Sequence, residues 1–470
     1  MLSHKCIDGE RVNSMNAIRN PFTYRIPVIK LVIKELQSAK FYAILLVLVM
    51  LAGIFSLSPT IPSLMNDVTA SLMNDVPPWS AANVTIRSNG TISTTKVTAR
   101  SGSPEDIQAA VDAVAAAGGG TVYIPEGNFS FTIDSNKTGM SNFPIGVEIL
   151  GGVNVVGAGM NKTWLIMSGD VDPSKRQASM FSCRGDQTPQ KPITISGISF
   201  KGYIDYSAPA GDDNVGEIEY FSYTGIVMHG VKDFRVHDCY FEDFHGKGVG
   251  ADNTRSAVSG KYVLRGVIDH CVFDNPYRDI SGTVWGYGVG VSGEYDTWEE
   301  DIDNILGKYV NLSVFVEDCS FSRCRHSIAS SSGAIWVFRH NHLTNHPSGG
   351  NSYIDSHGGP YSVRCSVAYN NIIDDSDGGN VGVGLRGRGG LIFNNTFINI
   401  YIGISLNNDA GTPEKRKCHD IWIWGNTFVD VEVTLSTDAE TEENIDYFLY
   451  KKTDYTPYPY PHPLTLETTP

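Results

Sequence analysis

The stretch Phe234-Arg235-Val236-His237-Asp238-Cys239-Tyr240-Phe241 contains a short pattern that returns through much of the chain. An apolar residue, any residue and a second apolar residue are followed by two turn residues, a small or amide residue, any residue and a large apolar residue. Two other clear copies are Val314 to Phe321 and Ile421 to Phe428. The small or amide positions, in order, are Ala158, Ile198, Cys239, Cys271, Cys319, Asn341, Asn371, Asn395 and Asn426. The large apolar positions are Met160, Phe200, Phe241, Phe273, Phe321, Leu343, Ile373, Phe397 and Phe428. This repetition predicts a solenoid.

The solenoid that fits this pattern is a right-handed parallel β-helix, an all-β fold. Parallel strands of successive coils stack about 4.8 Å apart, so equivalent side chains form ladders. Asn suits the bend between two strands, because it tolerates left-handed backbone and its amide can bond its neighbours in the stack. We therefore interpret the Asn and Cys positions of the register as structural. The copies are 22 to 48 residues apart, and the longer spacings predict loops on one face of the solenoid, often the binding face.

The N-terminal part of the chain predicts a membrane signal. Residues 1–40 form a basic segment, and residues 41–57 contain no charged residue. This predicts a transmembrane signal anchor with the following domain outside the cell. The alternative is a cleaved signal peptide and a secreted protein. Residues 58–95, rich in Pro, Ser, Thr and Asn, are predicted to be a stalk.

The charge balance argues against a nucleic-acid partner. Residues 1–57 contain seven Lys or Arg and three Asp or Glu, so the rest of a chain of net charge −15 carries −19. A nucleic-acid-binding groove would need a basic surface, which this composition does not provide.

A capping helix is predicted at Pro104 to Ala117, with Ser103 as its N-cap. A strand at Thr121 to Ile124 follows it. Residues 106–127 resemble the N-terminal cap of the pectate lyase superfamily, and residues 153–159 resemble that family's first coil. The resemblance covers residues 98–432 in outline and implies a right-handed parallel β-helix, so the β-helix domain is predicted at residues 96–432. It does not imply one chemistry, because that superfamily includes lyases, hydrolases, epimerases, tailspikes and inactive adhesins.

Residues 433–470 are predicted to be an acidic cap segment and a tail rich in Tyr and Pro. Within the cap segment, Thr437 to Tyr450 is expected to form a short helix. The tail is interpreted as an aromatic strap along the solenoid rather than a sugar-binding platform. His340, His342 and His346 resemble a metal-binding set, but His340 is predicted in a bend and His342 outward on a strand, so no metal is assigned. The eight Cys show no zinc spacing and are interpreted as buried thiols.

A further strand precedes the repeated pattern in each coil, and polar residues stand at the ends of these strands. In the resembled family, substrate lies along the face that such strands form. Stacked at about 4.8 Å per coil, the polar residues of four consecutive coils would fall within roughly 15 Å. We predict Asp355, His357, Arg386 and Arg388 as catalytic residues. We predict His229, Asp252, Glu294, Arg325, His326, Asn407 and Asp409 as substrate-binding residues.

Two mechanisms fit these residues. Hydrolysis would use a carboxylic acid and a second carboxylate, such as Asp355 with Asp252 or Asp409. In β-elimination, Arg386, Arg388 or His357 would remove the proton beside a uronate whose charge is neutralised by Arg or Ca²⁺. No clear cluster of Asp ligands for Ca²⁺ appears, so Ca²⁺ remains an option without an assigned site.

The predicted function is cleavage of an extracellular polysaccharide by β-elimination or hydrolysis. The alternative is a non-catalytic surface protein, such as an adhesin, a glycan-binding module or an envelope component. A sugar epimerase is a third hypothesis. An aromatic loop near the predicted site is also expected to stack on sugars or pack on the solenoid; it contains Trp285, Tyr287, Tyr295 and Trp298.

Overall fold

The structure is a computed structural model, and it describes residues 95–139, 142–168, 177–185, 191–203, 222–252, 264–275, 286–293, 302–308, 313–346, 352–358, 362–375 and 379–466. The predicted anchor at residues 41–57 and Glu294 lie outside the described residues. No helix within the described ranges is both long and apolar enough to cross a membrane.

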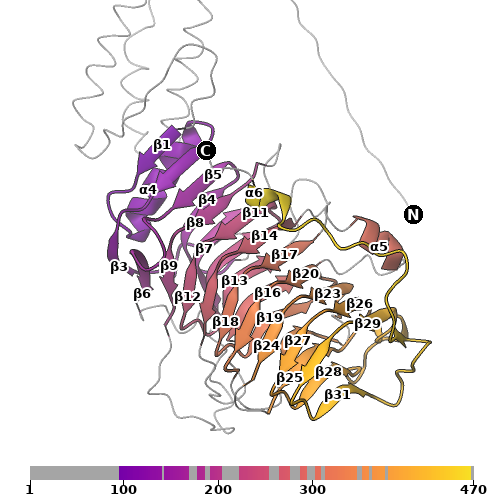
Figure 1. Cartoon of the computed structure of the whole chain (residues 1–470). Helices are drawn as coiled ribbons and strands as arrows, with labels where there is room; N and C mark the ends of the chain where they lie inside the picture. The colour runs from indigo at the N-terminus through magenta and orange to yellow at the C-terminus, as the bar shows by residue number, and fades with distance from the viewer. Residues whose placement is uncertain are drawn as a thin grey trace, which may run out of the picture. The chain divides into compact units, whose positions relative to one another are not determined.

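The described residues form three parallel sheets, to which successive coils contribute one strand each (Figure 1). Sheet 1 consists of β1 (Thr95–Thr98), β2 (Gly120–Tyr123), β5 (Val153–Val156), β8 (Thr194–Ser196), β11 (Lys232–His237), β14 (Arg265–Asp269), β17 (Val314–Glu317), β20 (Ile335–Arg339), β23 (Cys365–Tyr369), β26 (Gly390–Phe393), β29 (Ile421–Trp424) and β32 (Tyr447–Phe448). Sheet 2 consists of β4 (Ile145–Leu150), β7 (Gln177–Arg184), β10 (Ser222–His229), β13 (Lys247–Asp252), β16 (Tyr287–Ser292), β19 (His326–Ser331), β22 (Ser352–Ser356), β25 (Val381–Leu385), β28 (Ile402–Leu406) and β31 (Val433–Thr437). Sheet 3 consists of β3 (Gly127–Phe131), β6 (Thr163–Met167), β9 (Ser199–Lys201), β12 (Tyr240–Glu242), β15 (Val272–Asp274), β18 (Ser320–Ser322), β21 (His342–Thr344), β24 (Ile372–Asp374), β27 (Thr396–Ile398) and β30 (Thr427–Val429). This is the predicted parallel β-helix.

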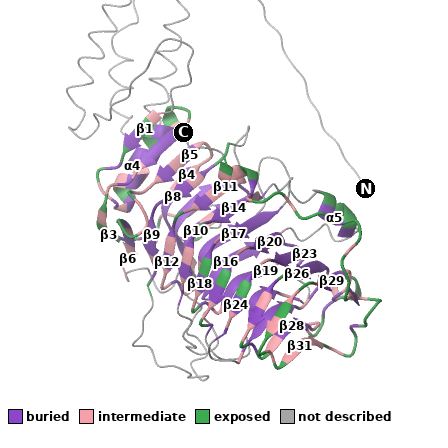
Figure 2. Cartoon of the chain, in the orientation of Figure 1, coloured by how far each residue is buried: buried purple, intermediate pink, exposed green. Residues whose placement is uncertain are grey.

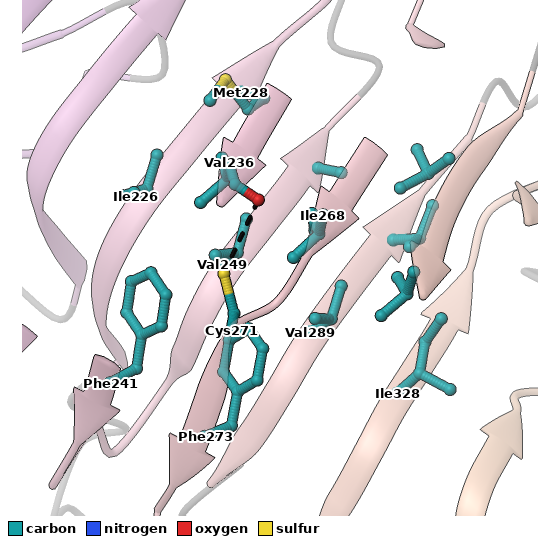
Figure 3. Packing of buried hydrophobic residues seen from close by; sticks show 14 of the residues in the cluster. Ile226, Met228, Val236, Phe241, Val249, Ile268, Cys271, Phe273, Val289 and Ile328 are labelled. Carbon is teal, nitrogen blue, oxygen red and sulfur yellow. Dashed lines mark hydrogen bonds between the residues drawn. The ribbon is translucent and has the colours of Figure 1, made fainter. Parts of the chain in front are cut away.

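The large apolar positions of the repeat form a ladder inside the solenoid, as predicted. The rings of Phe200, Phe241, Phe273 and Phe321 stack with neighbouring centroids 5.1, 4.9 and 4.7 Å apart. Figure 3 shows Phe241 and Phe273 beside the inward-facing residues of sheet 2. Sheet 2 makes room for the rings with glycine, because a Cβ at Gly248 would lie 2.7 Å from Phe273.

One member of the predicted ladder is wrong. Leu165, not Met160, pairs with Phe200 in sheet 3. The connection before β6 contains Gly159 and Asn161, both with positive φ, and this wider turn shifts the first copy by five residues.

The Asn positions form the predicted hydrogen-bond ladder. Asn371 Nδ2 donates to Asn395 Oδ1 at 2.9 Å, and Asn371 Oδ1 accepts the backbone N–H of Asn341 at 3.0 Å. The left-handed backbone falls one position earlier than the amide, at residues such as Asn370 (φ 57°). The seven described cysteines are buried free thiols, and the backbone N–H of Cys271 donates to Cys319 Sγ.

The N-terminal end of the solenoid is covered by α4 (Pro104–Ala116), as predicted. Ser103 caps this helix, because its side chain accepts the backbone N–H of Asp106 at 3.3 Å. Ile107, Val111 and Val114 are buried against the first coil. The exposed residues are more frequent in the last coils and in the connections that follow them (Figure 2).

The helix predicted at Thr437 to Tyr450 is not formed. Thr437 ends β31, and a turn leads from there to β32. The side chain of Asp438 holds this turn, because it accepts the backbone N–H groups of Asn408 and Glu440. Asn444 then takes a positive φ of 63°. Side-chain acceptors that bond nearby backbone donors compete with a helix in this way.

The tail is the predicted strap. Residues 455–466, here called the strap, run back along the outer face of sheet 1 to α6 (Pro463–Leu466), which contacts β11 and β14 (Figure 1). Tyr455, Tyr458 and Leu464 pack on the outward apolar side chains of sheet 1, together with α5 (Ile302–Lys308). A second apolar layer therefore covers sheet 1, whereas sheet 2 carries polar groups on its outer face.

Candidate functional site

The candidate site lies on the outer face of sheet 2, where the predicted upstream strands are all present. Along these strands, inward and outward residues alternate. Ile354 and Val383 face the core and pair in register, and their neighbours Asp355 and Gly384 form the next, outward pair. The side chain of Asp355 therefore reaches the outer face from the middle of the sheet.

Asp355 is the centre of a cluster of charged and polar groups. Its Oδ2 atom lies 2.8 Å from Nε2 of His357 and 2.6 Å from Nη2 of Arg386. Nε2 of His326 is 3.9 Å from the same oxygen. On its other side, Arg386 Nη1 lies 3.5 Å from Asp409 Oδ1, and Asp409 Oδ2 accepts the backbone N–H of Gly358 at 3.1 Å. The structure thus brings together predicted residues from four consecutive coils.

The neighbours of Asp355 keep it ionised. Burial would raise the pKa of this carboxyl group, because only 2 % of its side chain is exposed. The contributions of His326, His357 and Arg386 outweigh burial and hold the pKa of Asp355 well below its ordinary value. Asp355 is therefore a fixed negative charge and a hydrogen-bond acceptor.

The two imidazoles of the cluster differ in exposure and in hydrogen bonding. Burial lowers the pKa of His326 to about 4, so this ring is neutral at neutral pH. His326 Nδ1 lies 2.5 Å from the carbonyl oxygen of Ser352, which can only accept, so Nδ1 carries the proton and Nε2 the lone pair. The side chain of His357 is 33 % exposed. Since Nε2 of His357 donates to Asp355, its Nδ1 is the nitrogen left to accept a proton.

A pocket of about 450 Å³ opens beside this cluster. It is lined by Tyr287, Arg325, His326, Ser331, Ser332, His357, Gly358, Arg386 and Asp409. Five of these were predicted from the sequence. Tyr287 was expected in an aromatic loop, but it begins β16 and its ring centroid lies 4.9 Å from that of His326. Because the inward Val289 stands two residues later, simple alternation would place Tyr287 on the inward face as well, so no signal in the sequence pointed to its position in the pocket.

Arg388 and Asn407 do not line this pocket. Only four residues separate β25 from β26, so the chain has turned from sheet 2 to sheet 1 when it reaches Arg388. Arg388 lies near Asp420. The hydrogen bond with His419 lowers the pKa of Asp420 most, burial opposes this, and Arg388 adds a smaller lowering. Asn407 donates a side-chain hydrogen bond to Ser405. His229 and Asp252 lie further along sheet 2, in a separate cavity.

Within the described ranges, His326, Asp355 and His357 are the one group of three side chains that places a metal-ligand atom from each residue within 4.8 Å of the others. Two imidazoles and one carboxylate suit a transition metal rather than Ca²⁺, which prefers oxygen ligands. The Arg386 guanidinium, bonded to the same carboxylate, opposes a divalent cation at this place.

The histidines that resemble a metal-binding set in the sequence, and the buried Asp375, have structural contacts. His340 stacks on Tyr460 with ring centroids 3.7 Å apart, and His346 packs on Tyr353. Asp375 accepts two hydrogen bonds from Asn380.

No protein-family model and no curated protein matches the sequence. Solved structures do resemble the fold. A mutant tailspike protein of E. coli bacteriophage HK620 in complex with a pentasaccharide is 15 % identical, with a TM-score of 0.48, over 71 % of this chain and 55 % of that chain. The A-module of the Azotobacter vinelandii mannuronan C-5 epimerase is 14 % identical, with a TM-score of 0.31, over 71 % of this chain and 93 % of that module. A Geobacillus virus E2 protein is 12 % identical, with a TM-score of 0.37, over 74 % and 57 %. The matched region spans about half of the tailspike chain, and at these identities the likeness concerns the fold alone.

Proposed function

We propose that this protein cleaves a uronate-containing polysaccharide by β-elimination on the outer face of sheet 2. The observation that supports this most is the hydrogen bond between Asp355 and His357, formed next to Arg386 at the edge of an open pocket. A positioned base beside a cation is the minimum that this reaction needs.

His357 is the proposed base. The ionised carboxylate of Asp355 accepts from Nε2, which fixes the ring and leaves Nδ1 to take the proton at C5 of the uronate. As that C–H bond breaks, a C4–C5 double bond forms, the C4–O bond breaks, and the leaving oxygen takes a proton from water in the open pocket. Asp355 is a positioning residue in this scheme, because it acts through His357.

The cations of the pocket are proposed to neutralise the uronate carboxylate. Proton removal beside a carboxylate becomes easier when a positive charge offsets the charge that develops on it. Arg325 and Arg386 both line the pocket. The side chain of Arg386 is 34 % exposed, so its guanidinium can reach a substrate oxygen.

Hydrolysis is supported less well by this geometry. A glycosidase needs a carboxylic acid that is protonated when the glycosidic bond breaks. Asp355 has a lowered pKa, and Asp409 pairs with Arg386 and accepts from Gly358. Epimerisation shares the proton-abstraction step and differs in returning the proton without breaking C4–O.

The test is an assay of the full chain against a panel of uronate polysaccharides and neutral glycans. Ultraviolet absorbance reports the unsaturated uronate, and a reducing-end assay runs in parallel. We expect both signals to rise, and both to fall at least about 100-fold in Asp355→Asn and His357→Gln. His342→Ala is the matched control, because His342 is exposed on sheet 3.

The remaining outcomes identify the alternatives. Reducing ends without absorbance would indicate hydrolysis, and solvent hydrogen incorporated without cleavage would indicate an epimerase. Binding without turnover across the whole panel would overturn the catalytic proposal and leave a glycan-binding surface protein.

We also propose that residues 41–57 anchor the protein with the solenoid outside the cell. The 17 uncharged residues that follow a basic segment support this. Protease added to intact cells is expected to remove the solenoid domain. Its protection in intact cells, with digestion only after lysis, would contradict external placement.

A further inference from the structure

A second cavity, of about 90 Å³, opens on the outer face of sheet 2 at β7, β10 and β13. Its polar lining includes Ser179, Ser182, Thr224, His229, Lys247 and Asp252. The volume exceeds what one water needs and admits a carboxylate or hydroxymethyl group, though not a whole sugar ring. The proposed function assigns no role to this cavity.

Ser182 provides an independent sign that the cavity takes a ligand. Its side chain is fully buried, and its hydroxyl has no hydrogen-bond partner among the described residues. Buried hydroxyl groups are usually paired, because an unpaired one loses its bonds to water without replacement. A polar ligand group in the cavity would supply the missing partner.

Ser182 also lies in the same lateral row of sheet 2 as Asp355. The printed strand register runs from one to the other through Val227, Gly250, Gly290 and Ala329. Five strand steps separate the two ends of this row, which is roughly 24 Å at the usual spacing of about 4.8 Å. The strand spacing is close to the length of one pyranose unit in an extended chain, so an extended glycan can follow the row with about one sugar on each coil.

Lys247 bridges the interval between the cavity and the Asp355 pocket. It begins β13, and its side chain lies across the backbone of Gly290 in the next strand. A Cβ at Gly290 would lie 2.6 Å from Lys247 Cε and 3.1 Å from Nζ. The lysine therefore lies within the row because Gly290 has no side chain, and its ammonium group reaches the part of the row between the two pockets.

We propose that the Ser182 cavity and Lys247 form a second glycan-binding site, which holds the same polysaccharide about five sugar units from the one that reacts. Ser182 and the cavity receive a carboxylate or hydroxyl group of the distant sugar, and Lys247 contacts a carboxylate between the two sites. This rests on the proposed function for the identity of the glycan, a polyuronate, but not for the reaction.

The experiment compares uronate oligosaccharides of increasing length on the full chain and on Lys247→Met, which keeps most of the side-chain length and removes the charge. We expect KM to rise about tenfold for oligosaccharides of about six or more sugars, which is the loss of one charge-assisted contact. For trisaccharides, which cannot reach both sites, we expect a change of less than about twofold. Lys201→Met is the matched control, because Lys201 lies on sheet 3 and pairs with Glu242 and Asp243.

Ser182→Ala gives a second, smaller test at the far end of the row, with the same dependence on length. An equal loss for short and long oligosaccharides, or no loss for either variant, would overturn the proposal. Equilibrium binding of the same series, measured by calorimetry, separates this proposal from the reaction. Length-dependent binding without turnover would support the second site and contradict only the catalytic proposal.

Discussion

Two arginine–carboxylate pairs of equal length lie on different faces of the solenoid. Arg386 Nη2 is 2.6 Å from Asp355 on sheet 2, and Arg339 Nη2 is 2.6 Å from Glu317 on sheet 1. Both side chains of the sheet 1 pair are fully buried, whereas the side chain of Arg386 is 34 % exposed. The two pairs therefore share their shortest distance, but they differ in their surroundings and in the number of contacts, because Arg339 Nε also donates to Glu317 at 2.8 Å.

The strap completes the surroundings of Arg339. Beyond Glu317, its guanidinium donates to the Tyr369 hydroxyl at 2.6 Å and to the backbone carbonyls of Tyr458 and Pro459 at 3.1 and 2.8 Å. The ring of Tyr460 lies against it, with the centroid 5.3 Å from Cζ. Arginine with matched donors in all directions holds a chain segment and offers nothing to a ligand.

Arg386 has the opposite surroundings. Its Nε atom has no partner among the described residues, and its guanidinium faces an open pocket. The comparison teaches that exposure to a pocket, rather than the presence of an ion pair, distinguishes a candidate functional arginine from a structural one.

The largest expected effect is on the strap side. Replacing Arg339 by Met leaves Glu317 buried without its cation, and breaking a buried pair costs about 3–5 kcal/mol. We expect the free energy of unfolding to fall by this amount in guanidinium titration, and limited proteolysis to cleave the strap first. A loss below about 1 kcal/mol with an intact strap would show that the apolar contacts of Tyr455 and Tyr458 hold the strap alone.

A pH titration compares the two faces through one histidine on each. Burial lowers the pKa of His462 in the strap and of His326 in the pocket to about 4. Because these folded-state values lie below the unfolded value of about 6.5, the unfolded chain takes up protons first. Their contribution to stability is full above about pH 6.5 and is lost as the pH falls to about 4, by on the order of 2–3 kcal/mol for each histidine.

Substitution of the two histidines can show whether they, rather than other titrating groups, cause the loss of stability at low pH. His462 Nδ1 accepts the backbone N–H of Leu464 at 3.2 Å, a bond that a protonated ring would lose. His462→Gln and His326→Gln are each expected to flatten the decline between pH 6.5 and 4 in unfolding experiments. A decline that is unchanged in both variants would rule out these two groups as its source.

Arg386→Met is expected to have a smaller effect on stability. Asp355 keeps its hydrogen bond to His357, and the pocket admits water to the carboxylate. The loss should be about 1–2 kcal/mol, between the values for exposed and buried pairs. Under the proposed function, glycan turnover should nevertheless fall strongly. A stability loss as large as that of Arg339→Met would contradict the difference between the two faces.

The sequence could predict ladders because a ladder needs only register. Phe241 and Phe273 recur at a fixed offset from Cys239 and Cys271, and this offset survives loops of any length. The same register placed Asp355, His357 and Arg386 on neighbouring coils. The distances between these residues also depend on the direction of each side chain, which the alternation along the strand indicates.

The sequence could not predict turn geometry at single residues. Arg388 is two residues from Arg386, but a four-residue connection carries it to another sheet. Leu165, rather than Met160, occupies the ladder position next to Phe200, because the turn before it contains two positive-φ residues and is wider than the repeat implied. The acidic segment around Asp438 was predicted to be a helix. In the structure, the Asp438 carboxylate instead accepts a backbone hydrogen bond from Asn408 and holds a turn. In each case a local backbone choice outweighed the pattern.

The smallest expected effect is at the edge of the strap. Tyr460 is 49 % exposed, its hydroxyl donates to Asp318 Oδ1 at 2.6 Å, and its ring stacks on His340. Tyr460→Phe keeps the ring and removes one exposed hydrogen bond, so unfolding should change by less than about 1 kcal/mol. Guanidinium titration beside Arg339→Met tests this. If both substitutions cost the same, the strap would be held at its exposed edge as firmly as at its buried arginine, and matched burial would not be what separates the two faces.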